Sequence, residues 1–214
     1  DRVGIMPATV LSEVRLLGEH KGSVNIAAFN ADGNYCLSAG DDRRILLWNP
    51  RRETDADVPI KVYTGHNERV LGLCVAQDNA SFASCGGDRS VFVWDVPSGR
   101  VLRRLSGHSQ RVNAVAYAGD SCSVLVSASY DTYARCWDMR SRSTTSIQVL
   151  GGSADSLTAL AVSEHEVMTS SVDGAVRTYD LRAGAMISDT VGSAITNLAL
   201  SRDGHCILAA SLDA

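Results

Sequence analysis

The chain has 214 residues, of which 45% are hydrophobic, so it can bury a sizeable core. Its formal net charge of −4 and its pI of about 5.7 argue against a bulk electrostatic attraction to phosphate backbones or anionic lipids. No apolar run approaches the roughly 18 residues of a membrane span, and residues 1–14 lack the basic and apolar regions of a signal peptide, so we expect a cytoplasmic protein without direct membrane contact.

A pattern of polar and aromatic residues repeats along the chain. Four aromatic residues, each followed by Asn or Asp, recur at spacings of 46, 43 and 42 residues. An aspartate lies six residues before each aromatic residue and a hydroxyl lies ten before it, and in three copies a histidine lies 28 or 29 before it. The sets are His20, Ser38, Asp42 and Trp48; His66, Ser84, Asp88 and Trp94; His108, Ser127, Asp131 and Trp137; and Thr169, Asp173 and Tyr179, with Gly151-Gly152 in place of the fourth histidine. One unit has therefore been copied.

These copies divide the chain into consecutive units of one domain. Residues 1–13 form an N-terminal extension, and residues 14–18 align with the last strand of a unit, because VRLLGEH at 14–20 matches LRRLSGH at 102–108. Four complete units follow at 19–64, 65–106, 107–150 and 151–190. Residues 191–214 begin a fifth unit, which carries its own turn aspartate, Asp213.

Each unit is predicted to contain four short strands. VNAVAY, SVLVSAS and YARCW of the third unit and VLRRL of the second are rich in β-branched, aromatic and small residues, and turn residues separate them. The first three strands of a unit are apolar on both faces, so neighbouring units must cover them. The fourth strand is more polar, which suits an outer edge.

Units of roughly 40–45 residues with four strands, a Gly-His pair and a Trp-Asp pair resemble the WD-repeat (WD40) family of β-propellers. The fold expected from this resemblance is all-β, with four-stranded antiparallel blades, of which the chain holds about four and a half out of seven. In closed propellers of this family, a strand such as 14–18 completes the last blade. We therefore expect the natural chain to continue for roughly two to three more repeats, because an open arc leaves apolar blade faces in water.

The set His108, Ser127 and Asp131 also has the residue types of a hydrolase triad. A triad is needed once, whereas this set occurs three times, each time with an aromatic partner. A structural network explains the aromatic residue as well, because an indole N–H can donate to the hydroxyl, the hydroxyl to the imidazole and the imidazole to the carboxylate. We therefore predict structural tetrads and no enzyme, and the hydrolase stays as a remote alternative.

Other signals for metal, nucleotide or redox chemistry are weak. HEVM at 165–168 begins like a metalloprotease motif, but it lacks the second histidine and is predicted to lie in a turn between strands. Gly86-Gly87 and Gly151-Gly152 lack the Gly-Lys-Ser/Thr that ends a phosphate loop. The six cysteines form no C-x-x-C and lie mostly among small or apolar neighbours, so we expect small buried thiols rather than disulfides or zinc ligands. No metal or cofactor is predicted.

The WD-repeat resemblance implies a surface where proteins dock. In this family, the loops from a fourth strand to the next first strand and the turns from second to third strand share one face. Carried over position by position, the expected partner-binding residues are Asn25, Asp41, Arg69, Leu71, Arg111, Asn113, Tyr130, Thr158, Val172 and Thr196. Arg69, Arg111 and Tyr130 are the strongest candidates, because arginine and tyrosine are enriched in interaction hot spots.

The opposite face carries two further features. Arginines would gather there at 51, 52, 140, 142 and 182, but they alternate with acids, so we expect solvated rims and at most indirect contact with nucleic acid. The hairpin NPRRETDADVPI at 49–60 is four residues longer than its counterpart in the second unit. It is interpreted either as a protrusion for a specific partner or as a neutral surface insertion.

Several segments carry a closer resemblance, namely FNADGNYCLSAGDDRRILLWNP, RCWDMRSR, SVDGAVRTYDLRAG and SDTVGSAITNLALSRDGHCILAASLDA. Over residues 14–214 the chain is similar to the mitogen-activated protein kinase organiser family, small seven-bladed WD proteins also found among spliceosome components. This resemblance implies a non-enzymatic scaffold that assembles kinase-cascade members in the cytoplasm. The alternative that it implies is a subunit of the pre-mRNA splicing machinery in the nucleus.

Overall fold

The computed structural model describes residues 18–52, 58–119, 121–201 and 203–213, which form eighteen β-strands and no helix. No described segment is therefore a helix that could cross a membrane. In chain order the strands are β1 (Val24–Phe29), β2 (Cys36–Gly40), β3 (Arg44–Trp48), β4 (Lys61–Thr64), β5 (Val70–Val75), β6 (Ser81–Gly86), β7 (Ser90–Asp95), β8 (Val101–Ser106), β9 (Val112–Ala118), β10 (Val124–Ser129), β11 (Ala134–Asp138), β12 (Gln148–Leu150), β13 (Leu157–Val162), β14 (Glu166–Ser171), β15 (Ala175–Asp180), β16 (Met186–Thr190), β17 (Ile195–Leu200) and β18 (Ile207–Ser211).

The strands pair into four sheets of four strands and one sheet of two. Each larger sheet keeps the order of the chain, from β1 to β4, β5 to β8, β9 to β12 and β13 to β16, and β17 pairs with β18. All neighbours within a sheet are antiparallel. The predicted all-β class with four-stranded antiparallel blades is thus confirmed. We number the sheets as blades 1 to 4 and call β17–β18 the half blade.

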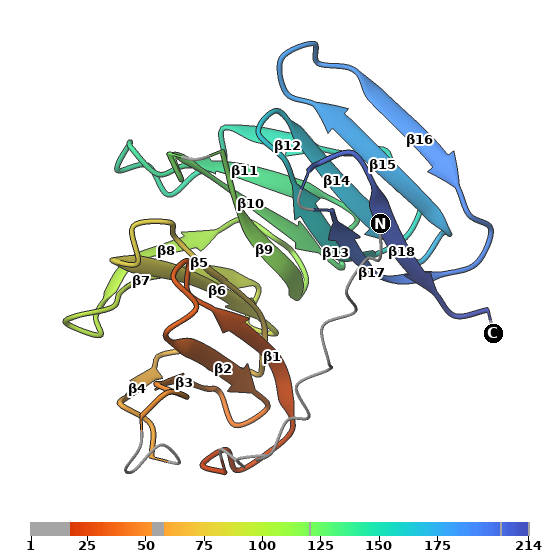
Figure 1. Ribbon diagram of the computed structural model, residues 1–214. Helices are drawn as coiled ribbons and strands as arrows, with labels where there is room; N and C mark the ends of the chain where they lie inside the picture. The colour runs from red at the N-terminus through yellow and green to blue at the C-terminus, as the bar shows by residue number, and fades with distance from the viewer. Residues whose placement is uncertain (1–17, 53–57, 120, 202, 214) are drawn as a thin grey trace, which may run out of the picture.

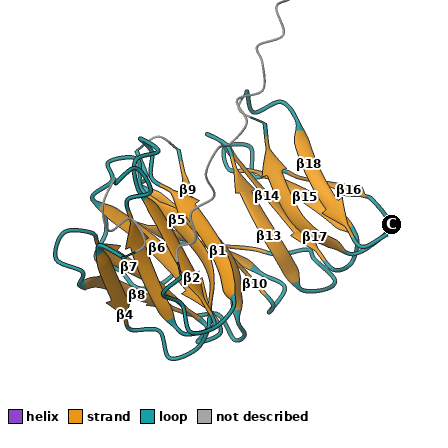
Figure 2. Cartoon of the chain, turned by 60° about the horizontal axis from the view of Figure 1, so that its bottom comes forward, coloured by secondary structure: helices purple, strands orange, loops and turns teal. Residues whose placement is uncertain are grey.

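The first strands of successive blades form a row. β1 contacts β5, β5 contacts β9, β9 contacts β13 and β13 contacts β17. The sheets fan out from this row in an open arc that runs from blade 1 to the half blade (Figures 1 and 2). The arc is not closed. The expected outer strand at 14–18 and the centre of the long hairpin, 53–57, lie largely or wholly outside the described residues.

The hydrophobic core lies between the blades. Trp94 of blade 2 shares a cluster with Leu37 of blade 1, and Trp137 of blade 3 shares one with Val91 of blade 2. Both indoles are only 1% exposed. Each blade therefore covers the apolar face of the one before it, which explains why the first three strands of a unit are apolar on both sides.

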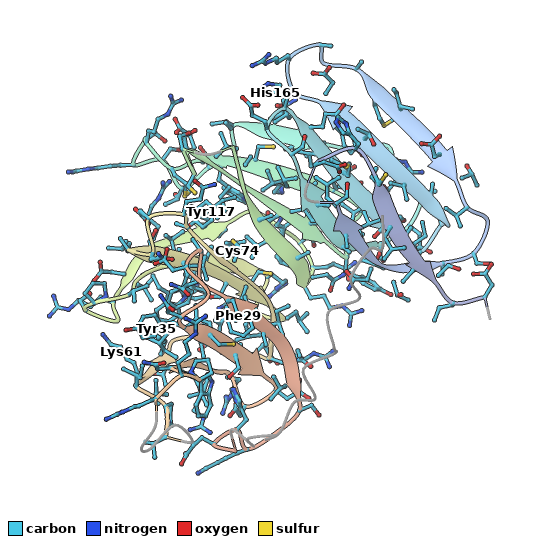
Figure 3. The ribbon with its side chains drawn as sticks, in the orientation of Figure 1. Phe29, Tyr35, Lys61, Cys74, Tyr117 and His165 are labelled. Carbon is cyan, nitrogen blue, oxygen red and sulfur yellow. The ribbon has the colours of Figure 1, made fainter. Side chains whose placement is uncertain are left out.

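The edges of the arc are more exposed than its interior. Every residue of β16 is exposed, including Met186 and Ile187, as expected for a fourth strand at the outer edge of its sheet, whereas β7 is buried for most of its length. Phe29 on β1 is 63% exposed and Leu208 on β18 is 72% exposed, because no further blade covers the two ends (Figure 3 labels Phe29). The predicted apolar end faces are therefore present within the described residues.

Two sequence predictions need correction. Only His165 of HEVM lies in the turn between strands, at the hairpin tip labelled in Figure 3, and Glu166 already begins β14 because Val167 and Met168 are buried in the blade. The six cysteines are free thiols, but only Cys85 and Cys136 are buried, while Cys36, Cys74 and Cys122 are partly buried and Cys206 is exposed. It lies in the turn of the half blade, which no neighbouring blade covers.

Candidate docking face

The predicted tetrads form hydrogen-bonded networks in blades 1 to 3. The indole N–H donates to the serine Oγ at 2.7, 2.8 and 2.9 Å in the three blades. The serine Oγ lies 2.7, 2.6 and 2.8 Å from the histidine Nε2, and the histidine Nδ1 lies 2.9, 2.8 and 2.9 Å from the aspartate. Because the indole can only donate, the hydroxyl is left to donate to Nε2, and Nδ1–H donates to the carboxylate. The members are Trp48, Ser38, His20 and Asp42; Trp94, Ser84, His66 and Asp88; and Trp137, Ser127, His108 and Asp131.

The environment of these groups supports a structural role. Ser84 and Ser127 have no exposed surface, so a substrate has no path to either hydroxyl. Burial opposes ionisation of Asp131, but hydrogen bonds from His108 and from backbone N–H groups outweigh it and lower the pKa of this carboxyl to about 2. Each aspartate therefore stays charged at neutral pH and ties the loop before the first strand to the turn after the second.

Blade 4 replaces the missing histidine with an arginine that the sequence analysis overlooked. Arg177 is only 8% exposed, and its Nη2 donates to Asp173 Oδ2 at 2.8 Å. The hydroxyl of Tyr179 donates to the carbonyl of Gly151 at 3.0 Å, and Thr169 Oγ1 is buried without a hydrogen-bond partner among the described residues. The structure thus places Thr169, Asp173 and Tyr179 in one blade, but it does not join them into a tetrad. The absent histidine is the sequence signal for this difference.

The tetrads of blades 1 to 3 and the Arg177–Asp173 pair of blade 4 lie at the edge of each blade where loops and turns meet. We call this edge the docking face: it consists of loops 18–23, 65–69, 107–111, 151–156 and 191–194 and turns 41–43, 87–89, 130–133 and 172–174. The loops precede the first strand of each sheet, and the turns follow the second. Because these strands are antiparallel neighbours, both kinds of connection lie at the same edge.

Five of the expected partner-binding residues occupy one repeated position. Each first strand has a β-bulge, and the residue without a partner in the register is the second residue of the strand. The five residues at this position are Asn25, Leu71, Asn113, Thr158 and Thr196. A bulge re-aims a side chain, so these side chains are directed differently from those of the rest of the strand.

Three of the bulge side chains connect one blade to the next. Asn25 Nδ2 donates to the carbonyl of Val70 at 3.0 Å, and Asn113 Nδ2 donates to the carbonyl of Leu157 at 2.6 Å. Thr158 Oγ1 likewise donates to the carbonyl of the first residue of β17 at 2.7 Å. In each case the acceptor is the first residue of the neighbouring first strand. These side chains act as links between blades, a role that the spacing of the motifs did not predict.

The other two bulge residues make no such link among the described residues. Leu71 has no polar group and is half-buried, and Thr196 Oγ1 donates to Ala210 within its own half blade. Asp41, another expected partner-binding residue, accepts a hydrogen bond from Asn25 Nδ2 at 2.8 Å. Val172 is 40% exposed at the tip of its turn.

Arg111 and Tyr130 form the most distinct exposed pair on the docking face. The guanidinium of Arg111 lies 4.4 Å from the centroid of the Tyr130 ring, within cation–π distance. The backbone N–H of Tyr130 also donates to the carbonyl of Arg111 at 3.0 Å, so the loop and the turn hold each other. Both residues are exposed, and Tyr130 keeps 39% of its surface accessible. The third strong candidate, Arg69, is exposed on the corresponding loop of blade 2.

Two further arginines lie on this face and were not among the partner-binding residues expected from the sequence. Arg43 and Arg89 follow the turn aspartate directly and have φ angles of 65° and 62°. Gly174 occupies the same position in blade 4 with a φ of 79°, and Thr132 in blade 3 with 73°. Left-handed backbone costs a residue with a side chain about 1–3 kcal/mol, whereas glycine adopts it freely. Alignment of the four turns, DDRR, GDRS, YDTY and VDGA, is the signal that could have revealed these two arginines.

A hollow of about 610 Å³ opens on the docking face between blades 2 and 3. Its lining consists of Gly87, Arg89, Ser109, Gln110, Arg111 and Tyr130. None of these described lining residues carries a carboxylate. The hollow therefore presents two guanidinium groups together with hydroxyl and amide groups, which suits an anionic or polar group of a partner.

The opposite face differs in its chemistry. A hollow of about 600 Å³ opens there between blades 1 and 2, near Tyr35 and Lys61 (Figure 3). The ammonium of Lys61 already donates to the carbonyls of Val96 and Pro97. A hollow of about 740 Å³ near His165 is lined by Glu164, Glu166, Asp180 and Asp203, along with Arg182 and two histidines. No group of three or more His, Cys, Asp or Glu side chains in the described part of the chain could hold a metal ion.

The sequence matches a known family over more than half of its length. The family model described as "WD domain, G-beta repeat" matches residues 11–49, 57–95 and 99–138. These ranges include all the residues of the three complete tetrads. Residues of blade 4 and the half blade lie outside the matched ranges, which agrees with the altered network around Arg177.

Individual relatives extend the similarity over most of the chain. The human WD repeat domain-containing protein 83 is 45% identical over 193 residues, 90% of this chain and 60% of the relative. The WD repeat domain-containing protein 83 homolog of Dictyostelium discoideum is 29% identical over 228 residues, 93% of this chain and 68% of the relative. The U5 small nuclear ribonucleoprotein 40 kDa protein of Dictyostelium discoideum is 30% identical over 169 residues, 79% of this chain and 46% of the relative. The chain thus spans about half to two thirds of the length of these relatives.

Proposed function

Because the chain belongs to the WD-repeat family, we propose that it is a non-enzymatic scaffold that assembles multiprotein complexes through its docking face. The observation that carries this proposal is the exposed pair of Arg111 and Tyr130. Arginine and tyrosine dominate interaction hot spots, and here both are held on short connections whose ends are fixed by a buried tetrad. A rigid anchor loses little conformational freedom when a partner binds.

The complexes that we propose are those of mitogen-activated protein kinase signalling in the cytoplasm. This part of the proposal rests on the resemblance of the segments 29–50, 135–142, 171–184 and 188–214 to the kinase organiser family. The 45% identity with the human relative over 90% of this chain supports a shared partner-binding surface. In this role the protein has no turnover of its own, and its effect is to raise the local concentration of the proteins that it holds.

A role in pre-mRNA splicing in the nucleus is the second candidate. The relative named as a U5 small nuclear ribonucleoprotein component supports it, since that protein is 30% identical over 79% of this chain. Contact with RNA would then be indirect, through protein neighbours. Arg140 of the opposite face already pairs with Asp138 at 3.3 Å, and four acidic residues line the hollow near His165 on that side. A continuous basic track for a phosphate backbone is therefore a weak alternative to a protein partner.

Affinity purification with identification of the bound proteins tests the scaffold proposal. The wild-type protein is compared with the double variant Arg111→Glu and Tyr130→Ala, and with Arg140→Glu on the opposite face as a matched charge-reversal control. We expect the double variant to lose its partners while the control keeps them. Kinases among the partners favour signalling, and splicing proteins favour the second candidate. Partners that are lost only from the Arg140 variant would refute the docking face.

A further inference from the structure

The docking face carries four arginines that make no hydrogen bond or ion pair through their side chains within the described residues. They are Arg43, Arg69, Arg89 and Arg111, and all four are exposed. Of the four, only Arg111 has a cation–π contact, because its guanidinium lies over the Tyr130 ring. By contrast, Arg44, Arg140 and Arg177 each pair with an aspartate. Other arginines thus form ion pairs within the protein, whereas these four guanidinium groups can bind a partner.

Two of these arginines occupy positions that oppose the stability of the fold. Arg43 and Arg89 adopt left-handed backbone conformations at a turn position that Thr132 occupies in blade 3 and Gly174 in blade 4. Their backbone N–H groups close the turn by donating to Gly40 and Gly86, but their side chains contribute no hydrogen bond or ion pair to the fold among the described residues, so both guanidinium groups stay open to a partner. What Arg43 and Arg89 supply is positive charge at the rim of blades 1 and 2.

The hollow between blades 2 and 3 brings two of the available guanidinium groups together. Arg89 and Arg111 line it, with Tyr130, Ser109 and Gln110 as further polar groups. Arg69 lies nearby, because its Cγ would be 3.7 Å from a side-chain carbon added at Gly87, which also lines the hollow. A guanidinium group presents a fork of N–H donors that matches a carboxylate in two-point geometry. The hollow can thus bind more than one carboxylate at once.

We propose that this hollow binds an acidic segment of a partner protein, rich in Asp or Glu, through Arg89, Arg111 and Arg69. The inference rests on the proposed scaffold function, whose docking surface it specifies. Charge complementarity selects this face, because acids line the hollow near His165 on the opposite face. RNA fits less well, since the guanidinium of Arg111 occupies one face of the Tyr130 ring, where a base would otherwise stack.

Fluorescence anisotropy tests this inference. The probes are fluorescein-labelled peptides in which two Glu-Glu pairs are separated by glycine spacers of increasing length, and the same peptides with Gln-Gln pairs serve as isosteric controls. We expect the chain to bind at least one Glu peptide with an affinity that falls as salt is raised, and to bind the Gln peptides at least tenfold more weakly. Arg89→Gly and Arg111→Gln should each weaken binding about tenfold, while Arg140→Gln on the opposite face leaves it unchanged.

Two further arms make the test specific. Arg89→Gly should melt at the same or a higher temperature than the wild type, because glycine relieves the left-handed strain, so lost binding cannot be attributed to unfolding. Glu68 lies beside Gly87, and Glu68→Gln should strengthen peptide binding by removing a competing carboxylate. The inference fails if the Glu and Gln peptides bind alike, if Arg89→Gly binds as the wild type does, or if a labelled single-stranded RNA binds more tightly through the same arginines. The scaffold proposal is tested separately. It remains supported in those cases if protein partners still require Arg111 and Tyr130 for binding.

Discussion

The side-chain amide of Asn113 in blade 3 donates a hydrogen bond of 2.6 Å to the carbonyl of Leu157 in blade 4. The same link joins blade 1 to blade 2 through Asn25 and Val70. These bonds begin at a β-bulge, so a local irregularity in one blade fixes the position of the next. The polar bulge residues Asn25 and Asn113 therefore stabilise the packing of adjacent blades.

Asn113→Ala should lower the free energy of unfolding by about 1–2 kcal/mol, because it leaves a carbonyl between two blades without its donor. Urea denaturation measures this change. Leu71→Asn is the matched variant, since it introduces the amide at the one junction between complete blades where the bulge residue is apolar. We expect Leu71→Asn to retain or raise stability. Equal stability of Asn113→Ala and the wild type would show that the link is not energetically significant.

Ser127→Ala should destabilise the protein by about 1–3 kcal/mol, because it removes a buried hydroxyl that bridges Trp137 and His108. Thr169→Val removes the hydroxyl at the same position of blade 4, where Oγ1 has no partner among the described residues, and it should be neutral or stabilising. Thermal denaturation of both variants gives the comparison. A larger loss for Thr169→Val than for Ser127→Ala would contradict the network described for blades 3 and 4.

Acid should weaken the fold through the buried aspartates. The pKa of Asp131 is lowered from 3.8 to about 2 in the folded protein, because the hydrogen bonds from His108 and the backbone outweigh the effect of burial. Its stabilising contribution is therefore complete above about pH 4 and is lost as the pH falls towards 2. Urea denaturation at a series of pH values should show this decline, and Asp131→Asn should make it shallower. An identical pH dependence of stability for Asp131→Asn and the wild type would show that Asp131 does not cause the decline.

Arg43→Gly should retain or raise the free energy of unfolding, by up to about 1 kcal/mol, because relief of the left-handed strain exceeds the added freedom of glycine in the unfolded chain. Arg43→Val should lower it, since a β-branched residue tolerates this backbone least. Differential scanning calorimetry of the two variants distinguishes strain from a bonding role. A loss of stability in Arg43→Gly would mean that the arginine side chain supports the fold.

The repeat made the fold predictable from the sequence. Four copies of one spacing place Trp48, Trp94, Trp137 and Tyr179 on equivalent strands, and the apolar faces of those strands require neighbouring blades. The tetrads were predictable for the same reason, because Ser127, His108 and Asp131 recur with an aromatic donor. Composition and spacing are sufficient to predict the fold when one repeated unit must pack against copies of itself.

Features that depend on contacts between units were not predictable in the same way. The bonds from Asn25 and Asn113 depend on a β-bulge and on the distance between adjacent first strands, which no single repeat encodes. The pairing of Arg177 with Asp173 replaces a histidine by a residue at a different position in the motif. The left-handed conformation of Arg43 and Arg89 is indicated in the sequence only by their alignment with Gly174, because neither arginine has a residue type typical of positive φ.

Hydrogen–deuterium exchange on the protein, alone and in complex with the partner that affinity purification identifies, tests the docking face most directly. Binding should slow amide exchange in the loop 107–111 and the turn 130–133, which carry Arg111 and Tyr130. The hairpins 96–100 and 139–147 lie on the opposite face and should exchange at unchanged rates. Protection confined to those two hairpins, with none at 107–111 or 130–133, would contradict the account.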